Sequence, residues 1–416
     1  MPAAVAVVPT IETSAAMEQS GFAAGTKINA QAFIDDLIQG DAIGVTSFGA
    51  QGVVNFPATG NSLVVVDASL QVLVEADAAV QALTFTDPSI NIGGGLQTAY
   101  GMFASAPAGL LPGVLLISTG QQNSGTDPTK LSSYQPTWVC APGPTANLSL
   151  LNQIAVLSRG QYYYIPTAND MMTILNQIRG QMPGWQTVFN QSRSIDPLSY
   201  WLPSLTLSAG LSQAQFSIVW NNPNLTYTSS SNPAANQVSV TLVQPPGIVL
   251  QTPPNVVGAG YCVFNIQNPV SAPGPWYVQV IYPGASGSTT PLQVTAGVFA
   301  LPTSSTIKLN LIPQGVPKAG SVCTIHAVLE NVSERIEIDH ATAEVVQRSG
   351  KVPFAGEEHS RKEIPMAVSQ GSPSTFMVEL HPVGGSFNVK AHIRGRLANS
   401  NTTFERAELM SIHVPE

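Results

Sequence analysis

Apolar residues follow two different periods over the first part of the chain. Fully apolar runs at residues 4–8 and 114–118 predict buried central strands. Apolar side chains at positions 30, 33, 34, 37 and 38 have helical spacing and predict a helix over residues 28–38. Further strands are predicted at 42–48, 63–66, 137–140 and 162–165, with helices at 68–83, 96–104, 148–157 and 171–178. This alternation predicts a doubly wound, mainly parallel sheet.

After residue 184 the pattern changes to short strands separated by Pro, Gly and Asn. We expect residues 185–204 to form a linker. Residues 205–302 and 303–416 each have the length and turn spacing of an immunoglobulin-like β-sandwich. The predicted fold class is therefore multidomain α/β plus all-β, with a doubly wound domain at residues 1–184 followed by two sandwiches.

Charged residues make up 10% of the 416 residues and are distributed unevenly. The first 196 residues contain 12 acidic and 5 basic residues, whereas residues 197–307 contain no Asp, Glu, Lys, Arg or His. From Lys308 onward there are 12 acidic and 11 basic residues, and all six histidines. This division supports three domains with a neutral one in the middle. The net charge of −8 argues against nucleic acid as a partner.

No apolar run reaches the ~20 residues that a membrane span needs. Residues 1–8 lack the basic start and long apolar core of a signal peptide. We therefore expect no membrane span, and no signal peptide in the chain as given. A cytoplasmic protein, a removed leader and another route of export all stay open.

Four stretches of the first domain, in this order, resemble a von Willebrand factor A domain over residues 3–182. The first, AQAFIDDLIQGDAIGVTSFG (30–49), matches the family's first helix, turn and second strand. The second, INIGGGLQTAYGMF (90–103), is similar to its Thr-Asn-Ile-Gly loop and the following helix. The third, VLLISTGQQN (114–123), matches the family's apolar strand that ends in Thr-Asp-Gly. The fourth, LNQIAVLSRGQYYYI (151–165), matches its late helix, turn and strand.

This resemblance implies a role in protein interaction and a cation site at the carboxyl ends of the strands. In the family, an Asp-x-Ser-x-Ser loop, a Thr and a second Asp hold Mg²⁺ or Mn²⁺, and a free coordination position accepts a partner's carboxylate. Here those positions hold Glu12, Ser14, Ala16, Ile90 and Thr119. Because one carboxylate is left, we expect no metal and no cofactor. The alternative is a weakly bound Mg²⁺ or Ca²⁺ at Glu12.

The segment YCVFNIQNPVSAPGPWYVQVIY (261–282) resembles a strand–turn–strand unit of the β-sandwiches that follow A domains in bacterial surface proteins. Similar units occur in calcium-activated chloride channel regulators. We expect Trp276 to fill the core of this sandwich. The chain has no His-Glu-x-x-His motif, which the metalloprotease-like segment of those regulators would require, so the protease activity is excluded.

The sequence contains no recognisable catalytic set. Glycines 93–95 lack the Lys-Ser/Thr of a P-loop. No G-x-S-x-G turn occurs, and no two histidines have the close spacing of a zinc site. We expect neither an enzyme nor a small-molecule substrate.

Two features of the β segments stay open. Cys262 and Cys323 lie in different predicted sandwiches, and a disulfide between them is one possibility. A group of basic residues in the last domain is interpreted as a solvated face. Its alternative role is a docking patch for the acidic first domain of a neighbouring copy. The group comprises Arg335, Arg348, Lys351, Arg361 and Lys362.

We predict a non-enzymatic structural or protein-binding component of a larger assembly or surface adhesive structure, acting through self-association or a hetero-complex. The uncharged residues 197–307 support this, because surface charge normally discourages association. The alternative is a metal-dependent adhesion receptor that binds an acidic partner. An extracellular or cell-surface location is favoured over the cytoplasm. The residues expected to contact a partner are Glu12, Ser14, Asn91 and Thr119.

Overall fold

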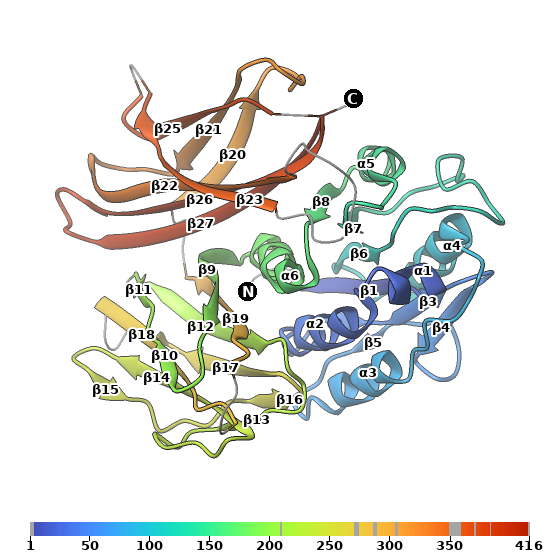
Figure 1. Cartoon of the computed structure of the whole chain (residues 1–416), viewed down its shortest axis with the longest axis horizontal. Coiled ribbons are helices and arrows are strands. Elements are labelled where there is room, and N and C mark those ends of the chain that lie inside the picture. Colours follow the sequence, from blue (N-terminus) through green and yellow to red (C-terminus); the bar gives the residue numbers. More distant parts are fainter. Residues whose placement is uncertain are drawn as a thin grey trace.

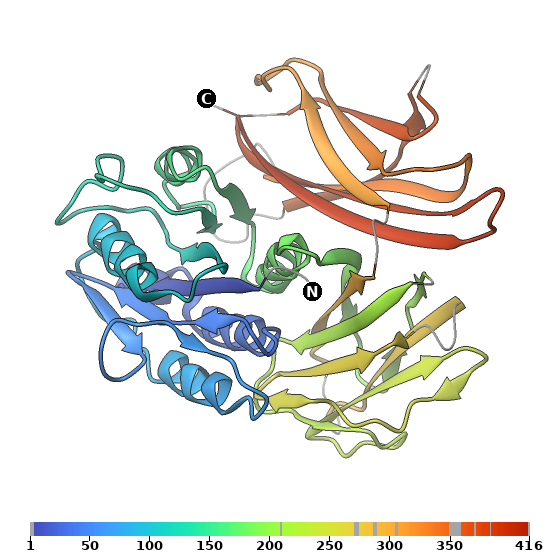
Figure 2. The same ribbon diagram turned by 180° about the vertical axis from the view of Figure 1, so that it is seen from behind.

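The chain is built from one α/β domain and two β-sandwiches (Figure 1). A computed structural model describes residues 4–208, 210–269, 274–285, 289–303, 307–348, 359–369, 372–382 and 384–414. We call the three parts the A-like domain, the middle sandwich and the C-terminal sandwich. Seen from behind, the A-like domain lies to one side and both sandwiches lie to the other (Figure 2).

The A-like domain is centred on a sheet with the strand order β4-β3-β1-β6-β7-β8. Strands β3, β1, β6, β7 and β8 are parallel, whereas β4 pairs with β3 in antiparallel fashion. Short strands β2 and β5 extend the sheet beside β1. The strands are β1 (Val5–Glu12), β2 (Ala42–Ile43), β3 (Val45–Phe48), β4 (Gly52–Phe56), β5 (Val64–Val65), β6 (Leu111–Ile117), β7 (Thr137–Pro142) and β8 (Gln161–Ile165).

Helices cover both faces of this sheet, because alternate residues of its buried strands point to opposite sides. Val7 and Ile11 of β1 pack with α2, α3 and α6, while Ala6 and Val8 pack with α4 and α5. The helices are α1 (Ala15–Gln19), α2 (Ala23–Asp35), α3 (Gln71–Gln81), α4 (Ile92–Met102), α5 (Leu148–Leu157) and α6 (Met171–Gln181), with short 3₁₀ turns η1 (Phe103–Ser105) and η2 (Ala168–Asp170). The predicted doubly wound fold is confirmed.

The middle sandwich consists of two sheets packed face to face, as predicted. Trp276 fills its core beside Phe216, with 5.7 Å between the ring centroids. The inner sheet, which faces the A-like domain, contains β16 (Val256–Gly258), β17 (Tyr261–Gln267), β12 (Leu211–Trp220), β19 (Leu292–Pro302) and β9 (Gln186–Ile195). The outer sheet contains β10 (Ser199–Trp201), β11 (Ser204–Leu207), β18 (Gly274–Tyr282), β14 (Gln237–Gln244), β13 (Thr226–Thr228) and β15 (Ile248–Val249).

The prediction of a linker at residues 185–204 is wrong. This segment instead supplies β9 to the inner sheet and β10 to the outer sheet. The alternation of apolar residues is weak in β9, because the strand side that meets α6 is polar. Asn190, for example, is buried and donates a hydrogen bond to the Thr173 carbonyl of α6 at 2.7 Å.

The C-terminal sandwich also consists of two antiparallel sheets around one core. One sheet has the order β20-β21-β25-β24 and the other has the order β23-β22-β26-β27. The strands are β20 (Lys308–Gln314), β21 (Cys323–Glu330), β22 (Ile336–Arg348), β23 (His359–Pro365), β24 (Ala367–Val368), β25 (Thr375–Leu380), β26 (Gly385–Leu397) and β27 (Thr403–Val414).

The cysteines are free and buried in all three domains, so Cys262 and Cys323 form no disulfide. Burial raises the pKa of the Cys262 thiol well above its usual range. Among the described helices, none is both long and apolar enough to cross a membrane.

Buried polar contacts tie the A-like domain to the inner sheet. Gln215 of β12 accepts a hydrogen bond from Arg179 Nε at 3.1 Å and donates one to the Asp36 carbonyl at 3.0 Å. The Arg179 guanidinium is fully buried and lies 4.1 Å from the ring centroid of Trp185. Burial raises the pKa of the Asp36 carboxyl to about 8, against the opposing effect of the Arg179 charge.

A second contact joins two carboxyl groups to one phenol. The Tyr261 hydroxyl of β17 lies 2.7 Å from Asp35 Oδ2 and 3.1 Å from Asp77 Oδ2. Burial and the nearby charge of Asp35 raise the pKa of Asp77, and burial also raises the pKa of Asp35. The folded protein therefore holds protons here that the unfolded chain has already released at neutral pH.

We predict that the protein is most stable in mild acid. Above the unfolded-state pKa of about 4, folding takes up protons at these carboxyls, so the free energy of unfolding falls as pH rises. Each such group contributes a slope of about 1.4 kcal/mol per pH unit until its folded-state pKa is reached. Urea unfolding between mildly acidic and mildly alkaline pH measures the decline, and Asp77→Asn should flatten it.

The matched control is Asp67→Asn, because Asp67 is exposed and its hydrogen bonds with Ser69 lower its pKa. This variant should keep the wild-type decline. Equal slopes for wild type and Asp77→Asn would contradict the assignment of the buried acid pair.

Candidate functional site

The carboxyl ends of the central strands β1 and β6 meet at the top of the A-like domain. Glu12 is the last residue of β1, and Ser14 precedes the first turn of α1. Ser118 and Thr119 directly follow β6. In parallel sheets this edge is where ligand sites form. The structure therefore brings together three residues singled out from the sequence, Glu12, Ser14 and Thr119.

The Glu12 carboxylate is fully buried, and both of its oxygens accept hydrogen bonds from neighbouring residues. Its Oε1 accepts from the Ser14 hydroxyl at 2.5 Å and from the Thr119 hydroxyl at 2.8 Å. Its Oε2 accepts from the Ser118 hydroxyl at 2.7 Å and from the Thr119 backbone N–H at 2.8 Å. Both oxygens thus have protein donors in place of water.

These residues do not fit a divalent cation as they are arranged. Glu12, Ser14 and Thr119 are 0%, 1% and 2% exposed, and the two hydroxyls direct their hydrogens at the carboxylate. Mg²⁺ requires near-octahedral oxygen ligands that include carboxylates and water. In the part of the chain that the structure describes, no group of three or more His, Cys, Asp and Glu side chains could hold a metal ion.

The other predicted positions have different surroundings. Ala16 lies in α1, and buried Ile90 uses its N–H to donate to Asn123 Oδ1 at 2.8 Å. Asn91 caps α4 by accepting from the Gly94 N–H at 2.8 Å. Because Glu12, Ser14 and Thr119 are buried, a partner reaches them only if these loops separate. Their role in partner binding stays a prediction.

Sequence reasoning missed the residues that complete this closed top. Gln122 accepts from the Ile92 N–H at 2.6 Å, and Asn123 joins the same loop to Ile90. Ser118 bonds to Glu12 from the position directly after the apolar run that predicts β6. That change from apolar to hydroxyl residues at a strand end is the signal that points to Ser118.

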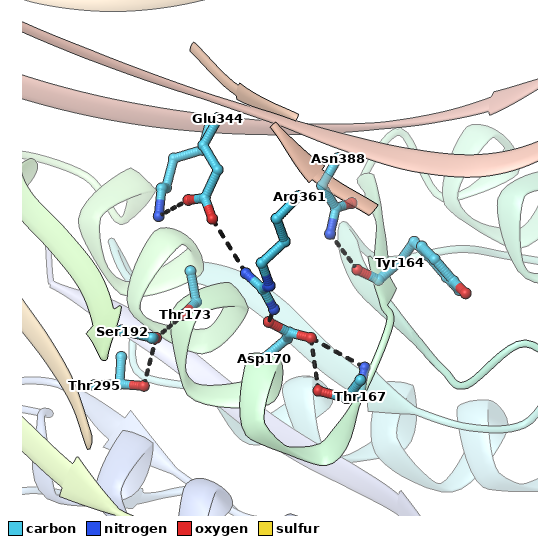
Figure 3. Close-up of polar contacts among 10 residues, drawn as sticks. Tyr164, Thr167, Asp170, Thr173, Ser192, Thr295, Glu344, Arg361 and Asn388 are labelled. Atoms are coloured by element: carbon cyan, nitrogen blue, oxygen red, sulfur yellow. Dashed lines mark hydrogen bonds and ion pairs between the residues drawn. The ribbon is translucent and has the colours of Figure 1, made fainter. Parts of the chain in front are cut away.

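A polar junction joins α6, its preceding turn and the C-terminal sandwich (Figure 3). Asp170 accepts hydrogen bonds from the Thr167 N–H and hydroxyl at 3.1 and 2.7 Å, and the first of these is one half of a capping box between the two residues. Its other oxygen pairs with Arg361 of β23. Arg361 also contacts Glu344 at 3.1 Å, and Lys390 pairs with Glu344. One chain of charges therefore runs between the two domains.

The free edge of β8 is covered at the same junction. The Tyr164 N–H donates to the Ser411 hydroxyl at 3.0 Å, and the Tyr164 carbonyl accepts from Asn388 Nδ2 at 2.9 Å. Unpaired strand edges favour aggregation, and these side chains occupy one. Thr173, Ser192 and Thr295 form a hydroxyl chain at 2.8 and 2.7 Å that joins α6 to the inner sheet (Figure 3).

The basic group of the last domain is thereby partly reassigned. Arg361 contacts the acidic A-like domain of its own chain, where the sequence suggested a solvated face or a neighbouring copy. Lys362 and Arg335 have no such contact with Asp170. Lys351 and the Arg348 side chain lie outside the described residues.

We predict that Glu12→Gln destabilises the protein. The amide keeps one acceptor oxygen and turns two hydrogens toward groups that already donate, so about 3 kcal/mol of unfolding free energy should be lost. Urea unfolding measures the loss. The control Glu75→Gln removes the same charge from exposed α3 and should change little. A Glu12 variant as stable as this control would contradict the network.

We also predict that Asn388→Ala weakens the docking of the C-terminal sandwich. The change removes the hydrogen bonds that Asn388 makes with the Tyr164 carbonyl and the Ser411 hydroxyl, at a cost of about 1–3 kcal/mol. Thermal unfolding measures the change. Asn399→Ala, at an exposed turn of the same sandwich, is the control, and equal melting temperatures for both variants would contradict the prediction.

No protein-family model matches the chain, and no curated protein matches it. Similar solved structures include a von Willebrand factor type A protein from Catenulispora acidiphila, with 14% identity and a TM-score of 0.40, covering 80% of this chain and 63% of that one. The ArnB paralog VWA2 from Sulfolobus acidocaldarius has 9% identity and a TM-score of 0.32, with 99% and 67% covered.

The pilus adhesin SpaC from Lactobacillus rhamnosus GG has 11% identity and a TM-score of 0.33, with 97% of this chain and 57% of that chain covered. This chain therefore spans less than two thirds of the first and the last of these structures. With TM-scores below 0.5, these likenesses carry no argument about the fold, the activity or a partner.

Proposed function

We propose that this protein is a non-enzymatic structural subunit that binds protein partners in a larger assembly and does so without a divalent cation. The observation that carries the proposal is that hydrogen bonds from neighbouring residues surround the Glu12 carboxylate. A metal-dependent adhesion site needs an exposed cation with a free coordination position. Here the one carboxylate is buried and bonded to Ser14, Ser118 and Thr119.

The junctions between domains support a structural role. Gln215 and Tyr261 bind the A-like domain to the middle sandwich, and Arg361 and Asn388 bind it to the C-terminal sandwich. Rigid domains lose little conformational entropy when they enter a complex. The extracellular or cell-surface location expected from the sequence is part of the same proposal.

The second candidate is a metal-dependent receptor for an acidic partner. It requires the loops around Glu12 and Thr119 to open and admit Mg²⁺ or Mn²⁺. The position of both residues at the carboxyl ends of β1 and β6 is the observation that favours it.

Association in the presence of a chelator tests the proposal. We predict that light scattering of the full chain at tens of micromolar shows the same association with EDTA as with Mg²⁺ or Mn²⁺, because no metal ion takes part in the contact between subunits. Calorimetric titration with either cation should give no binding heat.

Each contrary result has a clear meaning. Binding heat together with association that EDTA abolishes would favour the receptor. A monomer under all conditions would contradict the self-associating form of the proposal.

A further inference from the structure

The outward face of the outer sheet carries several partly or largely exposed apolar side chains, although Ser239 on the same face is buried and β11 at one edge contacts β27. Tyr200 of β10 is paired with Ile281 of β18, and two rows further along the same face Tyr277 is paired with Val243 of β14. Val249 of β15 is paired with Val243 on the other side. These side chains share one face, because strand residues alternate between faces and their neighbours Trp276, Val278 and Val280 fill the core. We call it the outer face.

The outer face has no charge and combines apolar side chains with the polar residues Ser239, Thr241 and Gln279. Tyr200 is 64% exposed and Val249 is 43% exposed, while Ile281, Tyr277 and Val243 are half-buried. Two polar residues in its centre are bonded to each other, since the Thr241 hydroxyl donates to Gln279 Oε1 at 3.1 Å. A partner can therefore cover the face without leaving the Thr241 hydroxyl unsatisfied. In Figure 1, β14 and β15 lie on the side of the middle sandwich away from the A-like domain.

Leu198 lies two residues before Tyr200, directly before β10. Its side chain is 89% exposed, and its backbone φ of +63° lies in the left-handed region that leucine rarely adopts. The Leu198 N–H donates to the Pro283 carbonyl at 3.2 Å, which fixes this turn. A strained backbone that exposes a large apolar side chain points to a contact made outside the chain.

The charge pattern identifies the occupant. A charged partner surface would lose its hydration against the outer face and gain no counter-charge. In this chain, residues 197–307 are the long segment without charge, whereas the A-like domain and the C-terminal sandwich both carry charged residues. A surface of this chain that matches the outer face in its lack of charge is the outer face itself. Two flat sheet faces also pack well at about 10 Å.

We propose that the outer face binds the outer face of a second copy, which forms a two-fold symmetric dimer. The proposal rests on the structural role proposed above and names the surface that serves it. A two-fold contact uses the same patch on both copies, so each residue of the patch acts twice. Tyr200 and Leu198, two residues apart in the chain, are the most exposed of these apolar residues and meet the partner's apolar residues.

The test compares association of full-length variants by sedimentation velocity up to about 0.1 mM protein. Tyr200→Glu places a charge in the contact twice per dimer and should weaken dimerisation at least about tenfold. The matched control is Val74→Glu, which adds the same charge at a 58%-exposed position on α3 and should leave dimerisation unchanged. Circular dichroism confirms that both variants are folded.

Leu198→Gly supplies a test that does not depend on added charge. Glycine adopts the left-handed backbone freely, so the variant should melt no lower than wild type by more than a degree or so. It should nevertheless dimerise more weakly, because the exposed leucine is gone. A merely structural role for Leu198 would give the reverse pattern.

The outcomes separate the two proposals. Association of the wild type that Tyr200→Glu and Leu198→Gly do not weaken overturns the outer face as the contact and leaves the structural role standing. A monomeric wild type over the whole range overturns both the outer-face dimer and self-association.

Discussion

A single hydrophobic core runs from the A-like domain into the inner sheet of the middle sandwich, and the arrangement of the whole chain follows from it. Apolar side chains of α2 and α6 pack with Val219, Tyr261 and Phe299 from the sandwich. Exposing either apolar surface to water would cost a large free energy, so the two domains fold against each other. Polar groups that lie within this contact are then buried together with it.

Burial of those polar groups explains the chemistry of the interior. Arg179 is fully buried, donates a hydrogen bond to Gln215, lies against the Trp185 ring and is close to the carboxyl groups of Asp36 and Asp41. The top of the A-like domain shows the same solution, because hydroxyls and a backbone N–H surround Glu12. A buried charge must be matched by fixed donors or opposite charge. Around Glu12 this chain uses its own side chains and backbone for that purpose.

Regular periodicity made much of the fold predictable. The apolar runs of β1 and β6 and the helical spacing of α2 gave the doubly wound domain, and Trp276 was correctly placed in a sandwich core. The segment with β9 was mistaken for a linker, since Asn190 and its polar neighbours are buried by hydrogen bonds to α6. Hydropathy records burial by apolar contact and is insensitive to burial of this kind.

The site was predictable only in part for a related reason. Resemblance placed Glu12, Ser14 and Thr119 at one strand edge, and the structure brings them together. That Ser118 and a backbone N–H complete the shell depends on loop geometry, which no residue pattern specifies. Likewise, the sequence marked Arg361 as part of a basic group but could not show that Asp170 of the same chain is its partner.

The short connection between α6 and β9 has a consequence for avidity. Only residues 182–185 separate the helix from the strand, and Trp185 within them is buried. The chain therefore passes from one domain to the next without a hinge, and the top of the A-like domain points in one direction relative to the outer face. In a two-fold dimer, two such tops would stand at one fixed separation. A partner with matching spacing would then bind the second top at a high effective concentration, whereas one with different spacing would gain nothing.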